Sequence, residues 1–166
     1  MIHYTTGNIF NEPEGVVIVI PVNTVGVMGK GLALQAKNLY PDVWHDYKYL
    51  TSSQSNKDFT PGDVVSASDE AFLLFATKEH WRNPSRLEWI DKGLKIISNL
   101  SPTYYPMIAI PPIGCGLGRL NWNDVNQVII NRLIDNPITF KIYHPKEWRP
   151  NVSNTIRRDD HPDNTR

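Results

Sequence analysis

The run of residues 16–22, VVIVIPV, constrains the fold of this chain more than any other segment. Valine and isoleucine fill six of its seven positions. β-Branched residues favour extended backbone, and an unbroken apolar run indicates a strand that is buried on both faces. Such strands lie at the centre of sheets that helices cover on both sides, so the run predicts an α/β fold.

The rest of the chain alternates between strand-like and helix-like segments, as an α/β fold requires. Further strands are expected at residues 2–5, 64–67, 71–76, 107–110 and 138–143. Helices are expected at residues 30–40, 43–50 and 85–100, followed by a helix whose N-cap is Asn121 or Asn123. The third helix is predicted from a capping box, with Ser85 at the N-cap and Glu88 three residues later.

Length and composition predict one domain, residues 1–148, followed by a polar and flexible tail at residues 149–166. The formal net charge is zero, which argues against a global electrostatic attraction to nucleic acid. Cys115 is the sole cysteine, and no apolar run is long enough for a membrane span or a signal peptide. We therefore expect a cytoplasmic monomer with no membrane contact. The five histidines lack metal-ligand spacing, so no metal or cofactor is expected.

Two glycine-rich loops each follow a strand-like segment and lead into a helix-like one. The first, residues 25–31, reads VGVMGKG, and the second, residues 114–118, reads GCGLG. Such loops present backbone N–H groups to an anion, and the helix that follows adds partial positive charge. Either loop alone is equally well explained as a tight turn. Two of them at strand ends favour a bound diphosphate and thus a nucleotide ligand.

Neither loop matches a common phosphate-binding signature. A P-loop needs Gly-Lys followed by Ser or Thr, and Lys30 is followed by Gly31. The glycine spacings also differ from the dinucleotide fingerprint. Nucleoside triphosphate hydrolysis and hydride transfer are therefore disfavoured.

Two polar residues at strand ends are candidates for chemistry. Asn23 follows the apolar run, and its amide can both donate to and accept from a sugar hydroxyl. Without the flanking glycine loop, a turn-forming asparagine would be the better interpretation. Lys78 follows the strand-like segment 71–76. A partly desolvated lysine has a lowered pKa and can act as a nucleophile or base, whereas most lysines are solvated at the surface.

Aromatic and basic residues next to Lys78 form a local candidate for nucleic-acid contact. The side chains of His80, Trp81 and Arg82 can stack on a base or grip a phosphate, or they can pack beside a helix start. Cys115 has no neighbouring general base, so cysteine-protease chemistry is disfavoured.

Four segments, residues 6–10, 22–33, 76–82 and 111–122, together resemble the macrodomain family, which binds ADP-ribose. The resemblance extends from Ile2 to about Pro145. Within the family the combination is most similar to the DarG DNA ADP-ribosyl glycohydrolases, antitoxins that remove ADP-ribose from thymine bases in DNA and reverse the toxin DarT. The lysine motif followed by His-Trp-Arg is the most specific of the four segments.

The resemblance implies a three-layer α/β/α sandwich with a central mixed sheet. It also implies that Lys78 and Asn23 are catalytic, and that Asn23 contacts the distal ribose. The implied ADP-ribose-binding residues are Asn8 and Ile9 at the adenine, together with Asn23, Met28, Gly29, Lys30, Gly31, Leu32, Thr77, Ile113, Gly114, Cys115, Gly116, Leu117 and Gly118. The residues expected to face DNA are His80, Trp81, Arg82, Arg86 and Arg119. The implied partners are ADP-ribose, ADP-ribosylated single-stranded DNA and a DarT-type toxin.

Two positions depart from patterns in related macrodomains. Asn8 stands where many relatives have Asp, and its amide oxygen is a weaker acceptor for the adenine amino group. Gly118 stands where a branch with a catalytic lysine has Asp, which argues against hydrolysis of protein-linked ADP-ribose esters. Two alternatives remain open: a module that binds ADP-ribose without cleaving it, and a hydrolase of ADP-ribosylated protein.

Overall fold

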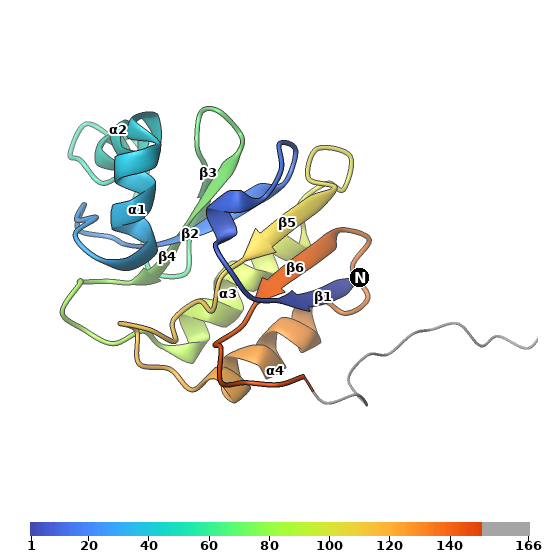
Figure 1. The fold of residues 1–166 in the computed structure, drawn as a ribbon. Helices are drawn as coiled ribbons and strands as arrows, with labels where there is room; N and C mark the ends of the chain where they lie inside the picture. The colour runs from blue at the N-terminus through green and yellow to red at the C-terminus, as the bar shows by residue number, and fades with distance from the viewer. Residues whose placement is uncertain (151–166) are drawn as a thin grey trace, which may run out of the picture.

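The computed structural model describes residues 1–150, and these residues form a sheet covered by helices on both faces (Figure 1). The six strands have the spatial order β1-β6-β5-β2-β4-β3. The strands are β1 (Ile2–Thr5), β2 (Val17–Asn23), β3 (Val64–Ser66), β4 (Phe72–Lys78), β5 (Met107–Ile110) and β6 (Thr139–Tyr143). Only the β3–β4 pair is antiparallel in this sheet, so the predicted mixed sheet is confirmed.

The helices divide into two pairs, one on each face of the sheet (Figure 1). The helical elements are the short 3-10 helix η1 (Ile9–Asn11) and the α-helices α1 (Gly31–Leu39), α2 (Pro41–Leu50), α3 (Leu87–Ser98) and α4 (Trp122–Leu133). The pair α1 and α2 covers one face, and α3 and α4 cover the other. This arrangement is the predicted three-layer α/β/α sandwich.

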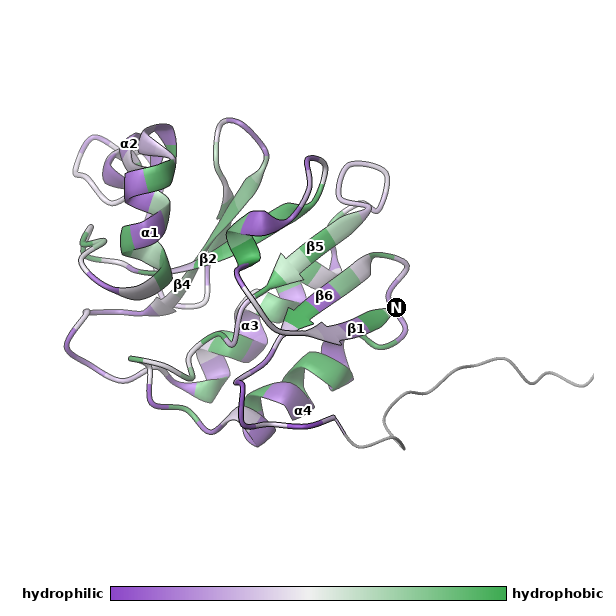
Figure 2. Cartoon of the chain, viewed as in Figure 1, coloured by the Kyte–Doolittle hydropathy of each residue, from purple (hydrophilic) through white to green (hydrophobic). Residues whose placement is uncertain are grey.

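The apolar run of β2 contributes to two cores at once, because alternate side chains of a strand point to opposite faces. Val17 and Val19 pack in the core under α3 and α4, whereas Ile18, Ile20 and Val22 pack in the core under α1 and α2. Figure 2 shows the resulting hydrophobic colour along the central strands. Burial on both faces explains why this strand shows no alternation of polar and apolar residues.

The start of α3 differs from the capping box expected at Ser85. The N-cap is Arg86, which makes no side-chain capping bond, and the helix begins at Leu87 and ends at Ser98 rather than at residue 100. Ser85 instead donates its backbone N–H to the carbonyl of Gly118, a contact outside the helix. The backbone N–H that Glu88 would bond in a capping box is therefore engaged with Gly118, and the Ser85 hydroxyl makes no hydrogen bond within residues 1–150.

The start of α4 decides between the two predicted caps. The side-chain oxygen of Asn121 accepts from the backbone N–H of Asn123 at 2.9 Å and from that of Asp124 at 3.4 Å. Asn121 is therefore the N-cap, and it satisfies N–H groups that have no partner within the helix.

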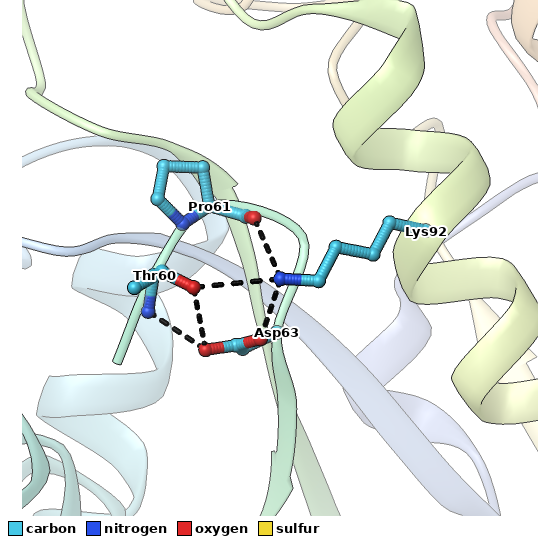
Figure 3. A network of polar contacts seen from close by, with 4 residues as sticks. All are labelled: Thr60, Pro61, Asp63 and Lys92. Carbon is cyan, nitrogen blue, oxygen red and sulfur yellow. Dashed lines mark hydrogen bonds and ion pairs between the residues drawn. The ribbon is translucent and has the colours of Figure 1, made fainter. Parts of the chain in front are cut away.

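A polar network ties the edge of the sheet to α3 (Figure 3). The Lys92 ammonium donates to Asp63 at 2.8 Å, to the Pro61 carbonyl at 3.3 Å and to the Thr60 hydroxyl at 3.4 Å. Gly62 lies in the same turn with φ +88°, and a Cβ there would be 2.6 Å from the Lys92 side chain. The turn that precedes β3 is thereby held against the helix that covers β4.

The parallel strands end at a common edge of the sheet. Because β1, β6, β5, β2 and β4 all run in the same direction, the loops that follow them meet at that edge. Both glycine loops and Lys78 lie there. Of the tail predicted at residues 149–166, only residues 149 and 150 are within the described part of the chain.

Candidate functional site

The first glycine loop folds around the side chain of Asn23, the last residue of β2. The Asn23 side-chain oxygen accepts from the N–H groups of Val25 (3.1 Å) and Val27 (3.3 Å), and its amide nitrogen donates to the Val27 carbonyl (2.7 Å). The Tyr47 hydroxyl of α2 lies 2.7 Å from the same side-chain oxygen. Asn23 therefore shapes the loop, as the turn-forming interpretation predicts, and only 7% of the residue is exposed.

The loop then leads directly into α1. Met28 is buried beneath it, whereas Gly29, Lys30 and Gly31 are exposed at the sheet edge. Lys30 is the N-cap of α1 and makes no side-chain capping bond. The first-turn N–H groups of the helix and its positive dipole end consequently lie where the loop meets the edge, an arrangement that suits an anion.

The second glycine loop, between β5 and α4, closes on itself through backbone hydrogen bonds. The N–H of Leu120 donates to Gly114 at 2.8 Å, and the N–H of Arg119 donates to Gly116 at 3.1 Å. Gly114 has φ +73°, and a Cβ there would meet the Leu120 side chain at 2.8 Å. Only glycine fits this position, and the exposed Gly116 lies at the outside of the loop.

The thiol of Cys115 in this loop is poorly suited to nucleophilic chemistry. Burial raises its pKa to about 11, because the thiolate is disfavoured away from water. The thiol donates a weak hydrogen bond to the Ile113 carbonyl at 3.5 Å.

Lys78 is the last residue of β4 and stands opposite Asn23 of β2. The register of the two strands shifts there, so that Val22 pairs with Ala76 and Asn23 pairs with Lys78, and Thr77 is passed over. Lys78 is 9% exposed, which contradicts the alternative of a solvated surface lysine. Burial lowers the pKa of the Lys78 ammonium, and the positive charge of Arg119 lowers it further.

The loop after Lys78 carries the aromatic and basic residues predicted to face DNA. The rings of His80 and Trp81 stack with centroids 5.3 Å apart, and the Arg82 guanidinium lies 4.6 Å from the Trp81 ring. Trp81 is 44% exposed. Arg86 is exposed beside Glu88 at 3.4 Å, and Arg119 is exposed on the neighbouring loop.

The predicted adenine end lies at η1, after β1. The Asn8 side-chain oxygen accepts from the N–H of Phe10 at 3.0 Å and caps this short helix. Ile9 is buried. The Glu12 carboxylate accepts from the Lys141 ammonium at 2.7 Å and from the Tyr143 hydroxyl at 2.5 Å, which holds η1 against β6.

Every predicted site residue thus belongs to a strand end, a loop or the first turn of a helix at one edge of the sheet. The sequence analysis missed three hydrogen-bonded pairs at this edge of the sheet. They are Tyr47 with Asn23, Thr24 with Glu79, and Ser85 with Gly118. These partners are distant in sequence, and no spacing along the chain indicates them. Within residues 1–150 no three His, Cys, Asp or Glu side chains gather as a metal site, and no helix there could span a membrane.

Known structures share this fold and much of the sequence. The DarG macrodomain of Thermus aquaticus is 33% identical with a TM-score of 0.76, and the match covers 87% of this chain and 99% of that one. This chain belongs to the macrodomain family. The DarG macrodomain of Mycobacterium tuberculosis is 34% identical with a TM-score of 0.76 and is covered to 98%.

A structure of Thermosipho africanus DarTG in complex with ADP-ribose also matches this macrodomain. It is 30% identical with a TM-score of 0.77, and the match covers 92% of this chain and 43% of that one. A curated DNA ADP-ribosyl glycohydrolase of Thermus aquaticus is 38% identical over 78% of this chain. The chain spans about two fifths of the length of such curated relatives. No protein-family model matches it.

Proposed function

We propose that this macrodomain is a DNA ADP-ribosyl glycohydrolase that removes ADP-ribose from thymine bases in single-stranded DNA and so reverses a DarT-type toxin. The observation that carries the proposal is the buried Lys78, which stands opposite Asn23 at the edge of the sheet where both glycine loops lie. Curated relatives that are named DNA ADP-ribosyl glycohydrolases support this proposal.

In this proposal ADP-ribose lies along the carboxyl edge of the sheet. The adenine is at Asn8 and Ile9, the diphosphate is between the glycine loops, and the distal ribose is at Asn23. Exposed backbone around Gly29 and Gly116 and the uncapped start of α1 support a diphosphate there. The binding residues proposed are those implied by the family resemblance, from Asn8 to Gly118.

Lys78 is the proposed catalytic group. The reaction breaks the bond between the anomeric carbon of the distal ribose and the thymine nitrogen. Because the pKa of Lys78 is lowered by burial, a larger share of the residue is free amine that can attack that carbon. The attacking amine gives up a proton as the new C–N bond forms, and the leaving thymine nitrogen takes one up. Water then displaces the lysine, its oxygen becoming the anomeric hydroxyl of ADP-ribose and one of its protons restoring the amine.

Asn23 acts mainly by shaping the loop around the distal ribose. Its side-chain oxygen is engaged with Val25, Val27 and Tyr47, and one amide hydrogen is donated to the Val27 carbonyl. An amide nitrogen carries two hydrogens, so the second can reach a ribose hydroxyl.

The DNA part of the substrate is proposed to contact the exposed Trp81 and the arginines around it. A tryptophan face stacks on any base, and Arg82 and Arg119 can pair with phosphates. Gly118 supports DNA rather than protein esters as the substrate. A Cβ there would lie 2.4 Å from the Gly114 carbonyl oxygen, so this position has no room for the Asp found in the related branch with a catalytic lysine.

We further propose that residues 1–148 form the domain, which acts as a monomer in the cytoplasm where the modified DNA is found. The ring of Trp148 lies 5.0 Å from that of Tyr4 and 5.7 Å from that of Trp122, which supports a domain end near this residue.

Lys78→Ala tests the proposal. We expect it to abolish release of ADP-ribose from a thymine-modified oligonucleotide while free ADP-ribose binds as to the wild type in calorimetry. Lys57→Ala, at an exposed lysine, is the control and should keep full activity. Wild-type turnover by Lys78→Ala would overturn the catalytic assignment. Binding without turnover by the wild type would identify a reader, and cleavage of only a modified peptide would identify a protein hydrolase.

A further inference from the structure

A tight turn directly after β4 holds a backbone carbonyl against the Lys78 side chain. The N–H of Asn83 donates to the His80 carbonyl at 3.1 Å and closes the turn. Trp81 lies inside this turn, and its carbonyl accepts from the Lys78 ammonium at 3.2 Å. The direction of the Lys78 side chain is therefore tied to the conformation of the turn.

The His80 ring is part of the same turn. Its Nδ1 accepts from the backbone N–H of Arg82 at 3.1 Å. A histidine nitrogen accepts such a bond through its lone pair, so Nδ1 acts as the acceptor in this contact. This side-chain bond holds the peptide group between Trp81 and Arg82, which is the one that carries the accepting Trp81 carbonyl.

Both ends of the loop are anchored elsewhere, so the turn has little freedom to move as a body. The Glu79 carbonyl accepts from the N–H of Thr24 at 3.1 Å and from its hydroxyl at 2.8 Å. The N–H of Ser85 donates to Gly118 at 2.9 Å. Between these anchors, the hydrogen bond from the Arg82 N–H to the His80 ring holds the turn in its conformation.

We propose that His80 is a positioning residue: through Arg82 it fixes the Trp81 carbonyl, and that carbonyl aims the Lys78 Nζ into the site. A lysine side chain has four rotatable bonds, and a reacting nitrogen displaced by an ångström loses much of its rate. The inference rests on the proposed function for its activity readout and has a second readout that does not.

Three variants separate the hydrogen bond from the ring. His80→Ala removes both, His80→Phe keeps a ring that can stack on Trp81, and His80→Asn restores an acceptor for an N–H two residues on. On a thymine-modified oligonucleotide under single turnover, we expect His80→Ala and His80→Phe to be slower by about tenfold and His80→Asn to stay within about twofold of wild type. Free ADP-ribose should bind all three as it binds the wild type.

The opposite ranking, with His80→Phe active and His80→Asn slow, would overturn the inference, because the ring rather than its acceptor would then matter. Full activity of His80→Ala would overturn it as well.

Reductive methylation of Lys78, followed by mass spectrometry, tests the same geometry without turnover. Exposed Lys57 is the internal standard. Relative to it, Lys78 should be methylated several-fold faster in His80→Ala and His80→Phe than in the wild type, and at the wild-type rate in His80→Asn. Equal labelling in all four proteins would overturn the inference. If the wild type fails to cleave modified DNA, the proposed function fails, while the labelling pattern still decides the role of His80.

Discussion

Ser85 donates its backbone N–H to the Gly118 carbonyl at 2.9 Å and thereby joins the loop after β4 to the loop after β5. The two residues are also in close packing contact, since a Cβ on Gly118 would lie 2.4 Å from the Ser85 hydroxyl oxygen. That hydroxyl is buried and has no hydrogen-bond partner among the described residues. The contact therefore ties the loop that follows Lys78 to the second glycine loop.

Gly118→Ala should therefore separate these loops. The new methyl group would collide with the backbone of Gly114 as well as with Ser85, and overpacking of this kind destabilises a protein by about 1–3 kcal/mol. We expect a lower midpoint in urea denaturation and about tenfold weaker ADP-ribose binding in calorimetry. Gly116→Ala is the matched control for stability, because nothing lies within 4 Å of a Cβ there, and it should leave the urea midpoint unchanged. An equal fall of the urea midpoint in the two variants would contradict this account.

Asn23→Ala should loosen the first glycine loop. The substitution removes the acceptor for Val25, Val27 and Tyr47 and leaves buried polar groups to find other partners, which costs about 1–3 kcal/mol. Tyr47→Phe removes one of these bonds and should be milder, with a smaller fall in melting temperature. Faster amide exchange at residues 24–27 in Asn23→Ala would identify the loop as the part affected. Unchanged exchange there would argue against the shaping role.

Trp81→Ala should weaken binding of modified DNA and leave binding of free ADP-ribose unchanged. Stacking of a base on an aromatic ring contributes about 1–3 kcal/mol, so the affinity for a modified oligonucleotide should fall by about tenfold or more. Tyr104→Ala is the control, since this tyrosine is 78% exposed on the loop before β5, at the other edge of the sheet. Fluorescence anisotropy measures both, and equal losses would remove Trp81 from the proposed DNA path.

Asp91 and Arg132 join α3 to α4 and should make stability depend on pH. Two hydrogen bonds from Arg132, at 2.7 and 2.8 Å, lower the pKa of the Asp91 carboxyl. A carboxyl whose pKa is lower in the folded state stabilises the fold above its ordinary pKa of about 3.9, and the effect disappears as pH falls through the folded value. Asp91→Asn should thus lower the melting temperature at pH 7 and have little effect near pH 2. Glu88→Gln, in the exposed pair with Arg86, should change neither.

Cys115 should react slowly with thiol reagents. With its pKa raised to about 11, little thiolate exists at pH 8, and we expect iodoacetamide to alkylate it about tenfold more slowly than free cysteine. The rate should keep rising to above pH 10. Cys115→Ser should keep ADP-ribose binding, whereas a lost affinity would give the thiol a role that its environment does not suggest.

Local patterns predicted the elements well where one physical cause dominates. The run at residues 16–22 lies almost entirely within β2, and Asn121 caps α4, because burial on two faces and capping act on neighbouring residues. The capping box at Ser85 failed because a partner 33 positions away, Gly118, holds the residue instead. Likewise, β4 extends to Lys78 rather than ending at Ala76, since pairing with Asn23 continues the strand.

The sequence indicates which residue types lie at the candidate site, but it does not indicate the hydrogen bonds that join them. Glycines and an asparagine at strand ends have local signatures, and a lysine after a buried strand is conspicuous. The contact of Lys78 with the Trp81 carbonyl and that of Asn23 with Tyr47 depend on how separate loops and helices meet. Neither contact can be predicted from the spacing of residues along the chain or from composition.

The register shift between β2 and β4 leaves Thr77 without a partner residue in β2. With regular pairing, Thr77 would stand opposite Asn23, and Lys78 would come one step later, with its side chain on the opposite face of the sheet. A single inserted backbone unit thus decides whether the amine of Lys78 or the hydroxyl of Thr77 stands opposite Asn23. The number of residues between Ala76 and the lysine is therefore as much a part of this site as the lysine itself.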